Sequence, residues 1–101
     1  MDERYIINVL IEYQFNIGEP SSNWPKQDFE RVAYARDAVD EIIMLWATNP
    51  DWTPMRATEE FKQIAADGMK RKIRYREVYD MYRIMYDTAN DVTDIINAIL
   101  P

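Results

Sequence analysis

The sequence predicts an all-α fold, a single domain of 101 residues built as a four-helix bundle. Glycine occurs twice and proline five times, which leaves little turn material for a β-sandwich or a barrel. Near the C-terminus, apolar residues recur at steps of three and four, as one face of a long helix requires. This apolar stripe consists of Tyr75, Val78, Tyr82, Met85, Ala89, Val92, Ile96 and Ile99. We expect helices at about 2–17, 25–48, 57–70 and 74–100.

The first segment fits two patterns. Ile6, Leu10 and Tyr13 lie on one face of a helix, whereas alternate residues from 7 to 17 are apolar, which is a strand pattern. A lone strand leaves its backbone groups unpaired, and the sequence offers no second strand, so a helix is favoured. In the alternative, residues 5–17 form a strand that pairs with its own copy across a dimer.

Proline and glycine place the remaining boundaries. Residues 18–25 form a turn-rich connector, and Pro25 suits the first turn of the second helix because its missing N–H would have no partner there. A second connector, at 49–54, also contains proline. Thr58 before two glutamates is typical of a capped helix start, and Gly68 favours a helix stop. The expected buried face of this third helix consists of Phe61, Ile64 and Ala65.

The apolar stripe of the fourth helix is predicted to form the core, with Val92 at its middle. Further apolar residues flank the stripe, namely Tyr79, Met81, Tyr86 and Ile95. This is more apolar width than three shorter neighbouring helices need, so the sequence also predicts a homodimer.

The net charge of −6 is unevenly distributed. The residues from 70 to 76 include five basic side chains, and the rest of the chain carries seven basic against 18 acidic residues, a net charge of −11. The basic patch consists of Lys70, Arg71, Lys72, Arg74 and Arg76. We expect most of the surface to repel nucleic acid and anionic membranes, and this patch to attract them. Because the overall charge opposes nucleic acid, nucleic-acid binding through residues 70–76 is an alternative rather than the favoured function.

The composition restricts the available chemistry. The chain has no histidine and no cysteine, so the commonest general base and all thiolate metal ligands are missing. Carboxylates at helical spacing could hold Mg²⁺ between facing helices and support a nucleotide hydrolase, which is a second alternative. They are Asp37, Asp40, Glu41, Asp87, Asp91 and Asp94. Since positions opposite the apolar stripe favour a solvated face, we predict no catalytic residue, no metal ligand and no cofactor.

The absence of disulfides favours a cytoplasmic setting. No apolar run approaches the ~18 residues that a membrane span needs, so we expect no membrane partner.

The favoured function is non-enzymatic: a small acidic protein that binds another protein, as an adaptor or an inhibitor. The expected partner carries a basic surface, and acidic mimicry of nucleic acid, a device of phage and mobile elements, is a more pointed form of this hypothesis. The candidate acidic face consists of Asp80, Asp87 and Asp94. The candidate aromatic contacts are Tyr79, Tyr86, Trp24 and Trp52.

Overall fold

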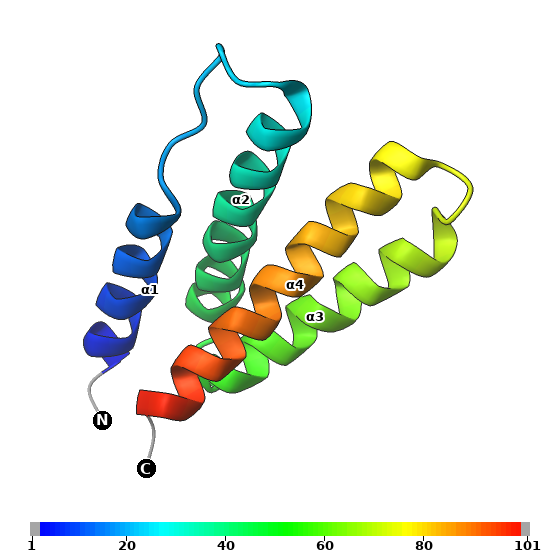
Figure 1. Cartoon of the computed structure of the whole chain (residues 1–101). Helices are drawn as coiled ribbons and strands as arrows, with labels where there is room; N and C mark the ends of the chain where they lie inside the picture. The colour runs from blue at the N-terminus through cyan, green and yellow to red at the C-terminus, as the bar shows by residue number, and fades with distance from the viewer. Residues whose placement is uncertain (1–2, 100–101) are drawn as a thin grey trace.

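The computed structural model describes residues 3–99, which form four α-helices joined by short connectors. The helices are α1 (Glu3–Ile17), α2 (Lys26–Thr48), α3 (Pro54–Arg71) and α4 (Arg76–Ile99). They pack against one another as a bundle (Figure 1), so the predicted all-α fold of four helices is confirmed. The predicted boundaries agree closely with these bounds, except at the start of α3.

The helices form two antiparallel hairpins. α1 lies beside α2, and α3 lies along α4 in the most extensive contact of the molecule. α4 also packs on α2 and, over a smaller area, on α1. The hairpins lie close where α1 begins and α4 ends, and they diverge toward the connectors at 18–25 and 72–75 (Figure 1). The bundle is therefore tighter at one end than at the other.

The first segment is a helix, and the alternative of a strand paired across a dimer is wrong. Ile6 and Leu10, four residues apart, are buried together on the inner face of α1. The helix ends before Gly18, whose φ of +91° lies in the left-handed region that glycine adopts at no steric cost. Arg36 of α2 donates hydrogen bonds from Nη1 to the carbonyl oxygens of Gln14 (3.3 Å) and Gly18 (2.6 Å). These bonds satisfy acceptors that the end of α1 leaves free.

α3 begins earlier than predicted, and Thr58 is not its cap. Thr53 caps the helix, because its Oγ1 accepts a hydrogen bond from the backbone N–H of Arg56 at 3.1 Å, and Pro54 occupies the first helical position. Thr58 lies inside the helix, fully buried, and its hydroxyl donates to the Pro54 carbonyl at 2.9 Å. Proline disrupts the interior of a helix but is tolerated in its first turn. The helix can therefore begin at Pro54 rather than after it.

Gly68 does not stop α3, although its residue type favours a helix stop; the predicted end of the helix, at about residue 70, agrees with the structure. The helix continues to Arg71, and Gly68 is buried within it against α4. A Cβ atom at this position would lie 2.6 Å from the ring of Tyr82. The glycine is therefore needed for the close approach of the two helices rather than for a turn.

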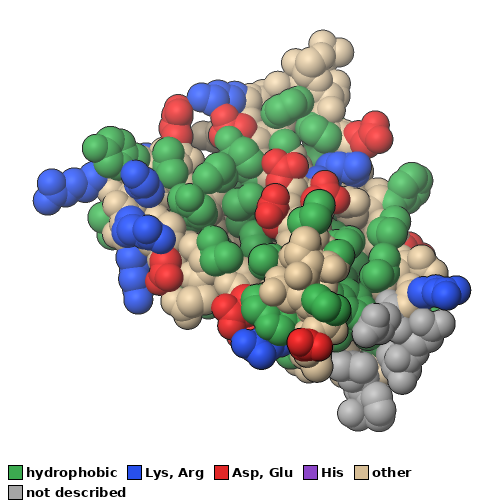
Figure 2. Space-filling model, turned by 180° about the vertical axis from the view of Figure 1, so that it is seen from behind, with side chains coloured by type: hydrophobic (Ala, Val, Ile, Leu, Met, Phe, Trp, Pro, Cys, Tyr) green, Lys and Arg blue, Asp and Glu red, His purple; other side chains and the backbone are tan. Residues whose placement is uncertain are grey.

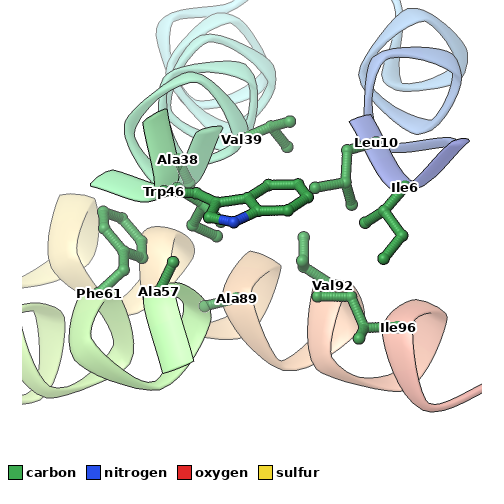
Figure 3. Close-up of a cluster of buried hydrophobic side chains, with 11 residues drawn as sticks. Ile6, Leu10, Ala38, Val39, Trp46, Ala57, Phe61, Ala89, Val92 and Ile96 are labelled. Carbon is green, nitrogen blue, oxygen red and sulfur yellow. The ribbon is translucent and has the colours of Figure 1, made fainter. Parts of the chain in front are cut away.

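All four helices contribute to one hydrophobic core. Figure 3 shows the indole of Trp46 between Leu10 of α1 and Phe61 of α3, with Val92 of α4 beside it. The core cluster consists of Ile6, Leu10, Ala38, Val39, Ile42, Trp46, Ala57, Phe61, Ala89, Val92 and Ile96. These residues come from the tight end of the bundle, which places the core there.

The apolar stripe of α4 is buried only in its C-terminal half. Its completely buried members are Ala89, Val92 and Ile96. At the other end Tyr75 is 64% exposed and Val78 36% exposed, so the prediction that the whole stripe is core is wrong there. Ile64 of α3, predicted to be buried, is 52% exposed. The cause is the divergence of the hairpins, which leaves this part of α3 and α4 without a covering layer.

Candidate binding site

The predicted acidic face of α4 is largely neutralised by its own helix. Asp80 lies 3.9 Å from both Arg76 and Arg83, and Arg83 also lies 3.7 Å from Asp87. Such exposed pairs add little stability, but they cancel much of the charge that a partner would meet. Asp80 and Asp87 therefore face compensating arginines, whereas Asp94 has no such ion pair within residues 3–99.

A groove of about 340 Å³ between the first halves of α2 and α4 is also balanced in charge. Its charged lining residues are Asp28, Glu30, Asp80, Arg31, Arg76 and Arg83. Lys26 of α2 spans the end of the groove, with its Nζ 3.0 Å from a carboxylate oxygen of Glu77 on α4. Equal numbers of acidic and basic groups give this groove no preference for a charged partner.

Residues 70–76 close the α3–α4 hairpin, and we call them the basic tip. Its five cations are all exposed, and no carboxylate within residues 3–99 pairs with Lys70, Lys72 or Arg74. Lys72 instead places its Nζ 5.6 Å from the ring centroid of Tyr75, a cation–π contact. Figure 2 shows Lys and Arg side chains gathered at this end of the hairpin. The basic patch expected from the sequence is thus one continuous surface.

Apolar side chains alternate with the cations of the basic tip. Ile73 is 70% exposed and Tyr75 is 64% exposed. Beside them, the predicted aromatic residues Tyr79 and Tyr86 share a shallow trough of about 390 Å³ with Met69 and Ile73. Two of the four candidate aromatic contacts are therefore adjacent to the tip.

The other two candidate aromatic contacts lie elsewhere. Trp52 packs against the core at the tight end of the bundle, and the guanidinium of Arg56 lies 4.9 Å above its ring. Trp24 is partly exposed in the connector between α1 and α2. The structure does not bring the two tryptophans to the surface that Tyr79 and Tyr86 share.

A second apolar surface lies on the flank of the hairpin that faces α2, and we call it the apolar hollow. It has a volume of about 260 Å³ and is lined by Glu41 of α2, Phe61, Ile64 and Ala65 of α3, and Met81, Tyr82 and Met85 of α4. Phe61 and Ala65 form its buried floor, whereas Ile64 is half exposed. Figure 2 shows hydrophobic side chains gathered on the hairpin beside the basic tip. Methionine side chains adapt readily to a bound surface, which suits this lining to binding.

Three carboxylates, which we call the acidic rim, lie in or within one helical turn of the lining of the apolar hollow. Glu41 lines the hollow itself, and Asp37 precedes it by one helical turn on the same face of α2. Glu60 precedes Ile64 by one turn on α3. All three carboxylates are exposed, so their charge is open to an approaching ligand.

The remaining carboxylates are not arranged as a metal site. Within residues 3–99, no three acidic side chains lie close enough together to hold a metal ion. Asp91 instead accepts a hydrogen bond from the Tyr13 hydroxyl at 3.2 Å, and Asp40 accepts one from the Gln14 amide at 2.7 Å. Burial, and next the charge of Asp91, raises the pKa of Tyr13 to about 12. Tyr13 therefore keeps its proton at neutral pH and serves to join α1 to α4.

Sequence reasoning missed the apolar hollow because it assigned Ile64 and Met85 to the core. The available signal was the excess apolar width of the fourth helix, to which Met81 contributed. Of the residues that give this width, Met81 lines the apolar hollow, whereas Tyr79 and Tyr86 lie in the trough beside the basic tip.

Comparison of the chain with protein-family models, curated proteins and solved structures gave no match. No helix within residues 3–99 is long and apolar enough to cross a membrane.

Proposed function

We propose that this protein acts by binding another protein, as an adaptor or an inhibitor, and that the apolar hollow with its acidic rim is the contact surface. The observation that supports this proposal is the half-exposed Ile64, which lies in a hollow lined by two methionines and a tyrosine. A partner of matching chemistry presents apolar side chains flanked by Lys or Arg, as one face of a basic amphipathic helix does.

Burial of apolar area and attraction between charges would both favour binding at this surface. Covering a fully exposed isoleucine is worth about 1.5–3 kcal/mol, so completing the burial of Ile64 would contribute part of that amount. The acidic rim would add steering, because opposite charges raise association rates and orient the approach. On α4, by contrast, Arg76 and Arg83 compensate Asp80 and Asp87. We therefore assign the working acidic surface to Asp37, Glu41 and Glu60.

Nucleic-acid binding remains a second candidate function, because the basic tip combines unpaired cations with the exposed ring of Tyr75. It predicts retention on heparin or DNA that falls steeply with salt, and loss of that retention when Lys70, Lys72 and Arg74 are replaced by Gln. The third candidate, a metal-dependent nucleotide hydrolase, has no supporting group of three carboxylates among residues 3–99.

The test compares two isoleucines of equal exposure. Ile64 is 52% exposed in the apolar hollow, and Ile11 is 49% exposed on α1. We expect Ile64→Asp to lose the proteins that the wild type captures from cell extract, while Ile11→Asp retains them. Thermal unfolding of both variants checks that each is folded. Retention of every partner by a folded Ile64→Asp would rule out the apolar hollow as the contact surface.

A charge experiment distinguishes the acidic rim from the predicted acidic face of α4, represented by Asp80 and Asp87. We expect Asp37→Lys with Glu41→Lys to slow association with the captured partner, and Asp80→Lys with Asp87→Lys to have a smaller effect. Neutralising Lys70, Arg71 and Lys72 should leave association unchanged or make it faster. If the α4 pair or the basic triple variant has the larger loss, the acidic rim is not the working surface.

A further inference from the structure

We infer that the apolar hollow of one copy of this protein receives the basic tip of a second copy, so that the chain associates with itself head to tail. The inference rests on the proposed role of the hollow as a docking site, and it names one occupant for it. The supporting observation is that one chain carries both the basic tip and the apolar hollow with its acidic rim. The two surfaces are opposite in charge, and both contain exposed apolar side chains.

The basic tip has the chemistry that the hollow requires. From Lys72 to Arg76, cations alternate with Ile73 and Tyr75, both of which are mostly exposed. Lys70, Lys72 and Arg74 have no carboxylate partner within the described part of the chain. Such a segment can insert an apolar side chain between helices while its cations meet carboxylates on either side.

The apolar hollow has the chemistry that complements the basic tip. Its floor is apolar, and its volume of about 260 Å³ is open to solvent at Ile64. The acidic rim places Asp37 and Glu41 on the α2 side and Glu60 on the α3 side. Cations on both sides of Ile73 would therefore meet negative charge on both walls of the hollow.

The geometry makes this contact intermolecular. The basic tip is the closed end of the α3–α4 hairpin (Figure 1). The apolar hollow lies farther along the same hairpin, where its lining also includes Glu41 of α2. Because the two packed helices α3 and α4 carry both surfaces, a chain cannot fold its own tip into its own hollow. The contact is also heterologous, joining unlike surfaces, so each copy in a pair still has one free surface. Further copies can add until a ring closes.

The test uses two variants that each retain one surface. The hollow variant is Ile64→Asp. A second, separate variant of the hollow is Glu41→Lys, at an exposed position outside the core. The tip variant combines Lys72→Glu, Ile73→Ser and Arg74→Glu, all at exposed positions. Light scattering and sedimentation measure the mass of each protein against concentration, from micromolar to millimolar. The monomer mass is 12.1 kDa.

We expect the wild-type mass to rise with concentration and to fall toward the monomer as salt screens the contact. Each variant alone should remain a monomer. Mixing the hollow variant with the tip variant should give a one-to-one dimer and nothing larger, because the tip of the first fits the intact hollow of the second. Ile11→Asp should associate as the wild type does.

A wild type that stays monomeric at millimolar concentration and low salt overturns the inference, and so does a mixture of the two variants that stays monomeric. Association of either variant alone overturns it too, since it indicates a contact between like surfaces. The proposed function is judged separately. If Ile64→Asp loses a captured partner while the wild type remains monomeric, the hollow binds another protein but not a second copy.

Discussion

Gly68 and Tyr82 illustrate how single residues decide the distance between the two most closely packed helices. An ideal Cβ on Gly68 would lie 2.6 Å from Cγ, Cδ1 and Cδ2 of the Tyr82 ring, which is closer than real Cβ contacts come. These atoms belong to the base and sides of a ring that also lines the apolar hollow, so the ring cannot move aside without disturbing that surface.

We predict that Gly68→Ala destabilises the protein by about 1–3 kcal/mol, as overpacked core substitutions do. Helix propensity alone predicts the opposite, a gain of about 1 kcal/mol. In the background of Tyr82→Ala the clash is absent, so the same substitution should become neutral or stabilising. Urea unfolding of the four proteins in this cycle measures the difference. A stabilising Gly68→Ala in the wild-type background would contradict the close approach.

Tyr13 gives the protein a pH-dependent contact between α1 and α4. Its pKa is about 12 in the folded protein, against about 10 in an unfolded chain, so the folded state holds the proton more strongly. The resulting stabilisation is complete below pH 10 and is lost as the pH rises from about 10 to about 12.

We therefore predict that the stability advantage of the wild type over Tyr13→Phe shrinks as the pH rises from about 10 to about 12. Tyr13 is only partly buried, and solvent screening limits the change to about 1 kcal/mol. Denaturant unfolding at several pH values measures it. Asp91→Asn, which removes the charge and keeps an acceptor, should weaken the pH dependence. An advantage that stays constant over this range would show that Tyr13 does not titrate as described.

At the scale of the helix, Thr53 and Pro54 determine where α3 begins. Thr53 and Thr58 both hydrogen-bond within this turn, but only Thr53 accepts a bond from a free backbone N–H. We predict that Thr53→Ala costs about 1 kcal/mol of stability, as the loss of an N-cap does. Thr53→Asp, which keeps the cap, should cost less. Chemical unfolding of both variants tests the assignment, and equal stability of Thr53→Ala and wild type would refute it.

The C-terminal half of α4 is the element on which the core depends. Val92 has no exposed surface and lies among side chains from the other helices (Figure 3). We predict that Val92→Asp abolishes cooperative unfolding, because an unpaired buried charge costs several kcal/mol. Asn97→Asp adds the same charge at an exposed position nearby and should melt as the wild type does. Circular dichroism melts compare the two, and a cooperative melt of Val92→Asp would show that the stripe is not the core.

At the scale of the whole molecule, the tightly packed core and the exposed apolar surfaces lie toward different ends of the bundle. The core lies at the tight end, where all four helices meet, whereas the basic tip and the apolar hollow lie on the hairpin that diverges from α2. Some apolar side chains on that hairpin remain exposed because none of the other helices covers them. The most deeply buried side chains of α4 and its most exposed large apolar side chain, Val78, therefore lie at opposite ends of that helix.

We predict that amide hydrogen exchange follows this division. Amides of residues 88–96 in α4 should exchange only by global unfolding, and those of residues 76–84 should exchange faster through local opening. The reason is that the first half of α4 has no completely buried side chain, whereas Ala89, Val92 and Ile96 are all fully buried. Exchange followed by mass spectrometry or NMR measures both sets. Uniform protection along α4 would contradict the division.

The sequence by itself determined the helices and most of the core. Steps of three and four identified the inner face of α1 and the buried C-terminal half of the α4 stripe, and the scarcity of glycine and proline excluded sheet folds. These properties are local, because side chains three and four residues apart meet on a helix whatever surrounds it. The sequence also located the basic tip, since its charges are contiguous in the chain.

Only the tertiary structure decided which part of each apolar face is covered. A helical pattern predicts which side of α3 is apolar, but whether Ile64 is buried depends on the angle between two hairpins, set by contacts far apart in the chain. The same angle exposes Tyr75 and Val78. It also forms the apolar hollow from α2, α3 and α4, whose residues no single pattern connects. Gly68 follows the same rule, because its role depends on Tyr82 across the interface rather than on its neighbours in sequence.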